Sequence, residues 1–455
     1  MSKIVPTELG TEKIRVLLKK YAIPAIIAMT ATSIYNLVDA IYIGHGLGAF
    51  AISGLAITFP FMNIQAAFGM LVGVGASTIL SVLLGQKNYK MAEKVLGNVV
   101  MLNLVIGTLL SVVCLSFINP ILGFFGASKD TLPYAREYMS VLLAGNLISC
   151  MYWSFNAILR AAGHPKQAMA STIMTVCINA ALDPIFIFVL HMGIRGAAVG
   201  TLLAQTIALV YLVKILSNKN DVVHLEKGIY KFNKTIDKEI LNIGLSPFFM
   251  NIVASGVIII INLQLKKYGG DIFIGAYGIV NRIAFLFLMV VFGFNQGLQP
   301  IVGYNYGAQL KERVIEGLKL TLFLAEIVMM TGFLLSQIIP KVLVGAFTTD
   351  PKLVEIAVLA LKFTMLAFPV ITIQAVGSNF FQSLGKSRIA LFLSLSRQLI
   401  FFVPLLFIMP MIKGTEGVWM AFPMADSLAA IVTAITLLRF IKKYRKEPTK
   451  LKTLS

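Results

Sequence analysis

Charged residues are scarce in this sequence. Only 13% of its 455 residues are Asp, Glu, Lys or Arg, whereas 58% are hydrophobic and the mean hydropathy is +0.85. A soluble domain carries about 25% charged residues, because its surface faces water. The composition therefore excludes an ordinary soluble enzyme and a disordered chain. It predicts a polytopic membrane protein with little material outside the bilayer.

Cysteine and acidic residues are also few. Cys114, Cys150 and Cys177 lie apart in apolar runs without paired spacing, which argues against disulfides, thiol chemistry and a cysteine metal site. Residues 1–20 lack the apolar core of a signal peptide. Asp and Glu total 20 against 39 Lys and Arg, and this basic excess lies in the predicted loops. We therefore expect a membrane surface, and no nucleic acid, to be the partner of these charges.

Long apolar runs predict twelve membrane-spanning helices. One hydrophilic segment, residues 217–239, divides them into six and six. We therefore expect an all-α protein with an N-terminal lobe (1–216), a cytoplasmic linker (217–239) and a C-terminal lobe (240–455). The approximate spans are 15–43, 51–84, 95–118, 133–161, 168–190, 195–216, 240–267, 274–305, 315–340, 353–384, 388–410 and 416–441.

The two halves resemble each other at an offset of about 222 residues. Pro24 aligns with Pro247, and Asp39 aligns with Asn262. Six helices per half give both halves the same orientation, so the repeat is parallel and predicts two lobes across a cleft. The second helix of each half carries the close-packing pattern GxxxG, at Gly69 and Gly73 and at Gly293 and Gly297.

Lys and Arg are distributed unevenly between alternate loops. One side of the membrane receives about 28 of them and the other about 8. Because cytoplasmic loops carry the basic excess, we expect both termini in the cytoplasm.

Two carboxylates lie deep in apolar helices of the first half, Asp39 and Asp183. Asn179 lies four residues before Asp183, on the same helical face, and Thr201 has a comparable depth in the next helix. Pro184 lacks an N–H, which leaves one backbone carbonyl without its usual donor. These oxygens suit a small hard cation such as Na+. They also suit a proton, because burial and like charge disfavour two ionised carboxylates. The alternative interpretation is helix packing alone.

The second half lacks this acid pair. Asn262 replaces Asp39, and Asp426 is the one remaining candidate acid there. Three cations lie within apolar runs, and we expect them to snorkel or to pair with helix carbonyls: Arg282, Lys362 and Arg397.

Signatures of catalysis are weak. Residues 385–387 read Gly-Lys-Ser, but the first glycine of a phosphate-binding loop is missing, so we predict no ATP site. An intramembrane prenyl or acyl transferase would need an acidic or histidine cluster at the membrane interface, such as D-x-x-x-D. The sequence contains no such cluster. We therefore expect a protein that is not an enzyme and holds no cofactor besides a small cation or a proton.

Together these features resemble the MATE (multidrug and toxic compound extrusion) transporters, especially the bacterial DinF/MepA-like branch. The resemblance covers essentially the whole chain. It rests on a proline-bearing first helix with an aspartate fifteen residues later, on the N-x-x-x-D-P pattern from Asn179 to Pro184, and on Thr201.

The resemblance implies antiport by alternating access in the bacterial inner membrane. Na+ or H+ enters while a small cationic, amphipathic compound leaves, and we expect a monomer. The family's cation site maps onto Asp39, Asn179, Asp183 and Thr201, and its helix hinge onto Pro24. Secondary candidates are Asn262, Asp426 and Arg397.

Three other functions remain open from the sequence. A lipid-linked saccharide flippase of the same superfamily would bind an anionic substrate through the intramembrane cations. The transferase and a plain channel fit less well, because an acid pair on a duplicated scaffold is typical of transporters.

Overall fold

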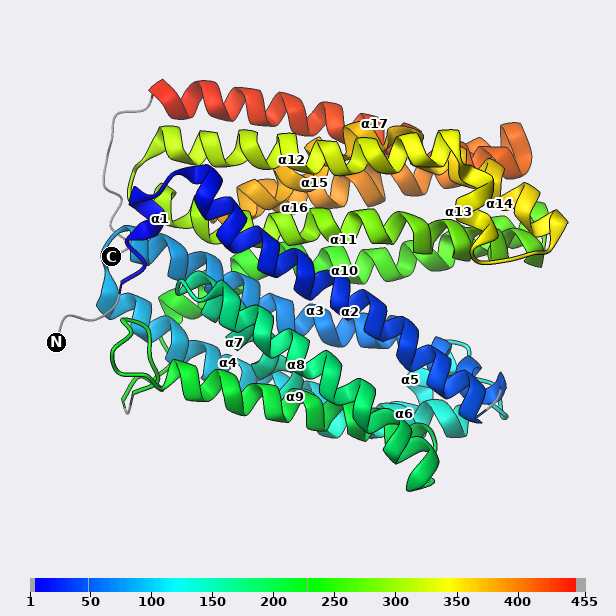
Figure 1. Ribbon diagram of the computed structural model, residues 1–455, viewed down its shortest axis with the longest axis horizontal. Coiled ribbons are helices and arrows are strands. Elements are labelled where there is room, and N and C mark those ends of the chain that lie inside the picture. Colours follow the sequence, from blue (N-terminus) through cyan, green and yellow to red (C-terminus); the bar gives the residue numbers. More distant parts are fainter. Residues whose placement is uncertain (1–4, 48, 227, 447–455) are drawn as a thin grey trace. The chain divides into compact units, whose positions relative to one another are not determined.

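The computed structural model describes residues 5–47, 49–226 and 228–446, and helices form nearly all of their regular structure (Figure 1). This agrees with the all-α fold predicted from the apolar runs. Each predicted span coincides with one helix or with consecutive helices. The helices are α1 Glu8–Thr11, α2 Ile14–Leu47, α3 Ala49–Gly85, α4 Tyr89–Ser116, α5 Ile118–Phe124, α6 Leu132–Ala144, α7 Asn146–Ala161, α8 Pro165–Pro184, η1 Ile185–Val189, α9 Ile194–Leu216, α10 Lys234–Gly269, α11 Asp271–Gly307, α12 Lys311–Ile338, α13 Pro340–Gly345, α14 Pro351–Thr364, η2 Met365–Ala367, α15 Phe368–Ser383, α16 Ser387–Leu395, η3 Ser396–Phe402 and α17 Val403–Lys446.

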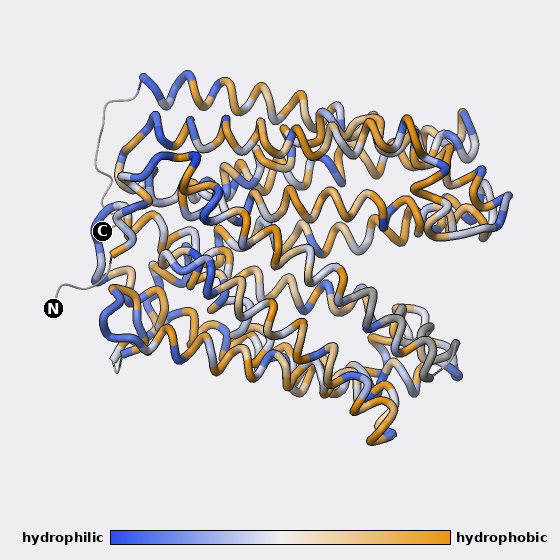
Figure 2. Tube along the Cα trace, in the orientation of Figure 1, coloured by the Kyte–Doolittle hydropathy of each residue, from blue (hydrophilic) through white to orange (hydrophobic). Residues whose placement is uncertain are grey.

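Breaks within helices separate or bend several spans. The fourth predicted span consists of α6 and α7, which meet at 57°. The last two spans are joined in α17, whose backbone is non-helical at Lys413 and Gly414. Nine helices of the described chain are long and apolar enough to cross a membrane, or ten if the bent pair counts as one span. Figure 2 shows hydrophobic residues along the helices and hydrophilic residues gathered at helix ends and loops.

Helix ends differ from the hydropathy spans where the first turns are polar. The helix predicted from residue 95 begins at Tyr89, because the Asn88 side chain accepts a hydrogen bond from the backbone N–H of Met91 (3.3 Å) and caps it. Charged residues on the first turns lower the local hydropathy without interrupting the helix, so hydropathy alone places this end too late.

Contacts between residues divide the chain into two compact units. Unit 1 contains Ile27–Phe248 and the N-terminal residues up to Glu12, and unit 2 contains Lys13–Ile26 and the chain from Phe249 onward. Two long helices are therefore shared. The first half of α2 packs in unit 2 and its second half in unit 1, whereas α10 begins in unit 1 and ends in unit 2.

Glycines permit the close packing of the start of α2 in unit 2. A Cβ atom on Gly297 of α11 would lie 2.6 Å from the Cα of Ala22, and one on Gly293 would lie 2.6 Å from the Cα of Ile26. The GxxxG pattern of α11 thus meets the α2 backbone on both sides of Pro24, a close approach that this spacing of small residues permits.

The start of α10 packs in the same way within unit 1. A Cβ on Gly75 of α3 would lie 2.0 Å from the carbonyl oxygen of Ile240, and one on Gly244 would lie 1.8 Å from that of Leu71. Gly75 belongs to α3 and Gly244 to α10, so each helix contributes one of the two glycines. Such distances require glycine at both positions, because a backbone atom cannot move aside as a flexible side chain can.

Candidate cation site

Neighbouring helices α8 and α9 of unit 1 provide the centre of the site. Asn179 and Asp183 lie one turn apart on α8, and the Asn179 side-chain amide donates to Asp183 Oδ1 (2.9 Å). The same amide lies 3.3 Å from Thr201 Oγ1 on α9. The Thr201 hydroxyl in turn donates to the backbone carbonyl of Ala197 (3.0 Å). Asn179 therefore fixes the carboxylate of α8 against the hydroxyl of α9.

The second carboxylate comes from α2. The Asp39 carboxyl lies beside that of Asp183, close enough for a hydrogen bond when one of them carries a proton. Both side chains are buried, with 7% exposure for Asp39 and 0% for Asp183. One turn earlier on α2, the Tyr35 hydroxyl lies 3.2 Å from Thr201 Oγ1. The structure thus brings all four predicted coupling residues together.

Three oxygens of this cluster are buried without a hydrogen-bond partner: Asp39 Oδ1, Asn179 Oδ1 and Asp183 Oδ2. An unsatisfied buried acceptor costs about 1–3 kcal/mol, and more when it is charged. Carboxylate and amide oxygens are the ligands that hard cations prefer. The set can therefore receive a small cation or a proton, and either ligand would relieve the cost.

Gly200 makes room for this arrangement on α9. A Cβ there would lie 2.6 Å from Asp183 Oδ1 and 3.3 Å from Asn179 Nδ2. Three further residues of the site were not predicted from the sequence: Gly200, Tyr35 and the buried Tyr138, which also faces the acid pair. The signals were present, because Gly200 adjoins Thr201 and Tyr35 precedes Asp39 by one turn. Glycines and tyrosines are too common in membrane helices for spacing alone to single them out.

Two prolines lie near functional segments of the helices. Pro184 ends α8, and the π-helix η1 follows directly after it. π-Helical turns often accompany functional sites, because they displace backbone groups from the regular ladder. Pro24 is buried inside α2, which continues through it as one helix. A hinge at Pro24 stays a prediction.

The secondary candidates occupy a different environment in unit 2. Arg397 Nε lies 2.6 Å from Asp426 Oδ1, and the aspartate is buried. Arg397 therefore has a carboxylate partner, where we expected snorkelling or helix carbonyls. Asn262 has a buried side-chain oxygen without a hydrogen-bond partner. Arg282 and Lys362 are exposed, as expected for snorkelling residues.

The second half contains another acid that was not predicted from the sequence, Glu326. It lies in the middle of α12, within an apolar run, and its side chain faces Thr372 of α15. The signal was the same as for Asp39 and Asp183, a carboxylate within a long apolar run. Asp426 is thus one of two deep acids in this half of the chain.

Comparison with known proteins shows where this architecture occurs. The MatE family model matches residues 24–185 and 247–408, one match in each half, which also confirms the internal repeat. The chain is 28% identical over 412 residues to the multidrug export protein MepA of Staphylococcus haemolyticus (strain JCSC1435), covering 90% of each chain. It is 29% identical over 415 residues to MepA of Staphylococcus aureus (strain MSSA476), covering 91% of each.

Solved structures show the same fold. The MATE multidrug transporter DinF-BH, solved in complex with a ligand, is 34% identical, with a TM-score of 0.89 over 96% of this chain and 98% of that one. An outward-facing multidrug resistance transporter of the MOP superfamily has a TM-score of 0.93 over 98% of this chain and 100% of that one. Its 24% identity supports the fold alone.

Proposed function

Since the chain belongs to the MATE family of membrane transporters, we propose that it exports cationic, amphipathic compounds in exchange for Na+ or H+. It does so by alternating access, as a monomer in the bacterial inner membrane with both termini in the cytoplasm. The observation that carries the proposal is the Asp39–Asp183 pair, with three buried oxygens that lack partners.

The site couples two ligands through charge. An empty, ionised acid pair attracts a cationic substrate, whereas a bound Na+ or H+ cancels one of its negative charges and weakens that attraction. A typical coupling free energy of about 1–3 kcal/mol makes each ligand weaken binding of the other by roughly 5- to 150-fold. Departure of the ion from the acid pair thus favours drug binding, and binding of the ion favours drug release.

The names of the relatives support export of drugs. MepA proteins are named as multidrug exporters, and DinF-BH is named as a multidrug transporter. The competing function, flipping of an anionic lipid-linked saccharide, needs free cations in the membrane. Arg397 supports it poorly, because Asp426 already neutralises its charge.

Efflux from proteoliposomes tests the proposal. The wild type, Asp39→Asn and Asp183→Asn are reconstituted, and efflux of a fluorescent monovalent cation is followed under imposed Na+ or pH gradients. We expect both variants to fold and to lose gradient-driven efflux. Asp130→Asn is the matched control, because Asp130 is an exposed loop carboxylate and its loss leaves the acid pair intact.

Two results would overturn the proposal. Wild-type efflux that ignores both gradients would exclude antiport. Export of a lipid-linked saccharide, lost in Arg282→Gln or Lys362→Gln while cation efflux is absent, would identify the flippase instead.

A further inference from the structure

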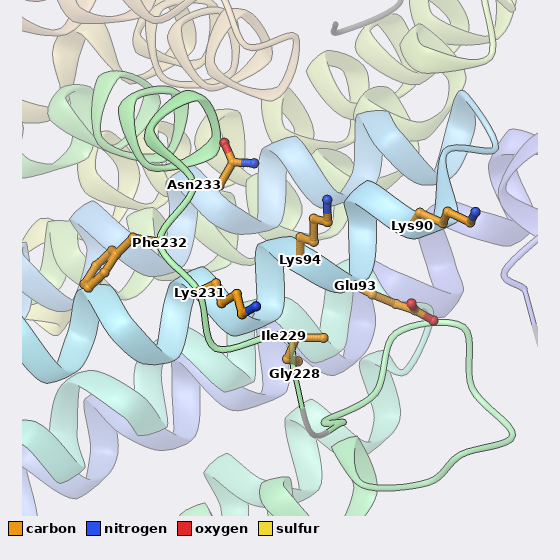
Figure 3. Close-up of a pocket in the computed structure, with 8 residues that line it drawn as sticks. All are labelled: Lys90, Glu93, Lys94, Gly228, Ile229, Lys231, Phe232 and Asn233. Atoms are coloured by element: carbon orange, nitrogen blue, oxygen red, sulfur yellow. The ribbon is translucent and has the colours of Figure 1, made fainter.

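A pocket of about 340 Å³ opens where the first turns of α4 meet the segment that leads into α10 (Figure 3). The pocket is unrelated to the cation site, although both belong to unit 1. Four of its lining residues are charged, three of them lysines. Its walls are formed by Lys90, Glu93, Lys94, Gly228, Ile229, Lys231, Phe232 and Asn233.

Specific contacts hold the linker in place at this pocket. The Asn98 side-chain oxygen on α4 accepts a hydrogen bond from the backbone N–H of Asn233 (2.8 Å). The carbonyl oxygen of Ile229 lies only 2.1 Å from where a Cβ on Gly97 would stand, so the linker backbone crosses α4 at a glycine. The linker wall is therefore a defined part of unit 1.

The pocket carries a surplus of positive charge. Lys90, Lys94 and Lys231 are all exposed, against a single lining carboxylate, Glu93. Among the described residues, these three lysines form no ion pair shorter than 4.0 Å. In Figure 3, Lys90 and Lys94 project from α4 and Lys231 from the linker that crosses it. A basic pocket of this kind attracts a phosphate group.

An apolar surface continues from the pocket along α4. At 3.6 residues per turn, Val105 and Val112 lie almost directly in line with Lys94, with Leu109 close beside them. These three apolar side chains are 48%, 58% and 61% exposed, respectively. Val105 is about 16 Å from Lys94 along the helix axis at 1.5 Å per residue. The same helix face thus presents cations at its end and an unpacked hydrocarbon surface beyond them.

We propose that this face binds an anionic phospholipid of the leaflet that adjoins the linker. The phosphate lies between the three lysines, and an acyl chain covers the exposed face of α4. Exposed aromatic rings of the linker, Tyr230 and Phe232, suit the headgroup level of the membrane, where such rings concentrate. A free phosphate would use the lysines but leave the apolar face uncovered, which favours the lipid as occupant. If the termini are cytoplasmic, this is the inner leaflet.

Native mass spectrometry of the full chain, purified in mild detergent, tests this proposal independently of transport. We measure binding of phosphatidylglycerol and of phosphatidylcholine to the wild type and to the triple variant Lys90→Gln, Lys94→Gln, Lys231→Gln. We expect the triple variant to bind phosphatidylglycerol about tenfold more weakly or worse, because each lysine contributes to attraction of an anionic lipid. The matched control removes three exposed lysines elsewhere, Lys214, Lys219 and Lys442, and should bind normally.

A second arm distinguishes lipid from free phosphate. Leu109→Ser with Val112→Ser should weaken phosphatidylglycerol binding severalfold, whereas Ile207→Ser with Val210→Ser on the exposed face of α9 should not. Millimolar glycerol phosphate should fail to displace the lipid. Equal loss in both lysine triples, equal binding of phosphatidylcholine, or displacement by glycerol phosphate would each overturn the proposal. Gel filtration and melting temperatures confirm that each variant is folded.

Discussion

At the scale of single residues, the candidate cation site depends on which oxygens lack donors. Asn179 satisfies one oxygen of Asp183 and lies near Thr201, while its own side-chain oxygen stays unpartnered. In unit 2, Asp426 is paired with Arg397. Asp183 thus keeps one buried oxygen without a partner, whereas Asp426 forms an ion pair. The difference comes from the neighbouring side chain.

Gly200→Ala tests whether this geometry governs ion binding. The added Cβ would lie 2.6 Å from Asp183 Oδ1, so the carboxylate must shift. Such overpacking costs about 1–3 kcal/mol. We expect a lower melting temperature and about a tenfold weaker response to Na+, or to pH between about 6 and 8 if a proton is the coupling ion. Thermal unfolding of the purified protein, measured across an Na+ titration at about pH 6 and at about pH 8, gives this response.

The matched control is Gly256→Ala on α10, where a Cβ would meet nothing within 4 Å. It should leave the ion response unchanged and be neutral or slightly stabilising, because alanine favours a helix by up to about 1 kcal/mol over glycine. An ion response equal in both variants would show that the position of the Asp183 carboxylate does not determine ion binding.

At the scale of helices, α2 and α11 pack through their backbones. Gly293 and Gly297 face Ile26 and Ala22, one on each side of Pro24. The segment in which we predict a hinge is therefore held against a neighbouring helix by a contact that tolerates no side chain. Bending at Pro24 would have to loosen this contact.

Gly297→Ala should disturb this contact. The new Cβ would lie 2.6 Å from both Cα and N of Ala22. These are backbone atoms, so they can move only if helix α2 moves with them. We expect destabilisation of about 1–3 kcal/mol and reduced transport. Gly278→Ala on the same helix, where a Cβ meets nothing within 4 Å, is the control and should stay close to wild type. Equal melting temperatures for the two variants would contradict close packing of these helices.

At the scale of the whole molecule, hydropathy and charge predict the direction of every span. The breaks at Lys413 and Gly414 and between α6 and α7 leave the order of the predicted spans unchanged. Orientation in the membrane stays a prediction, because it depends on surroundings beyond the chain itself.

Single-cysteine labelling tests the orientation. In a background without Cys114, Cys150 and Cys177, cysteines at Lys90, Lys219 and Lys311 should react with an impermeant maleimide only from the cytoplasmic side. Cysteines at Lys129 and Lys413 should react only from outside. Labelling of a member of the first group from outside in intact cells would refute the predicted topology.

The sequence by itself determined the class of fold and the repeat, and it singled out the four residues that meet in the candidate cation site. Hydropathy suffices for the spans, because every backbone group in lipid must be satisfied within its own helix. Carboxylates are so costly in lipid that Asp39 and Asp183 were conspicuous without a structure. Glu326 carried the same signal and was overlooked.

Only the tertiary structure decided which groups meet. Gly200 and Tyr35 belong to the candidate site because α9 and α2 bring them close to the acid pair. The spacing of residues along one helix gives no information about neighbours from distant segments. The ion pair of Arg397 joins residues 29 positions apart. The lysine pocket joins the start of α4 to a linker more than a hundred residues later. Local propensity determines helices one at a time, whereas contacts between helices depend on the side-chain shape and charge of both partners.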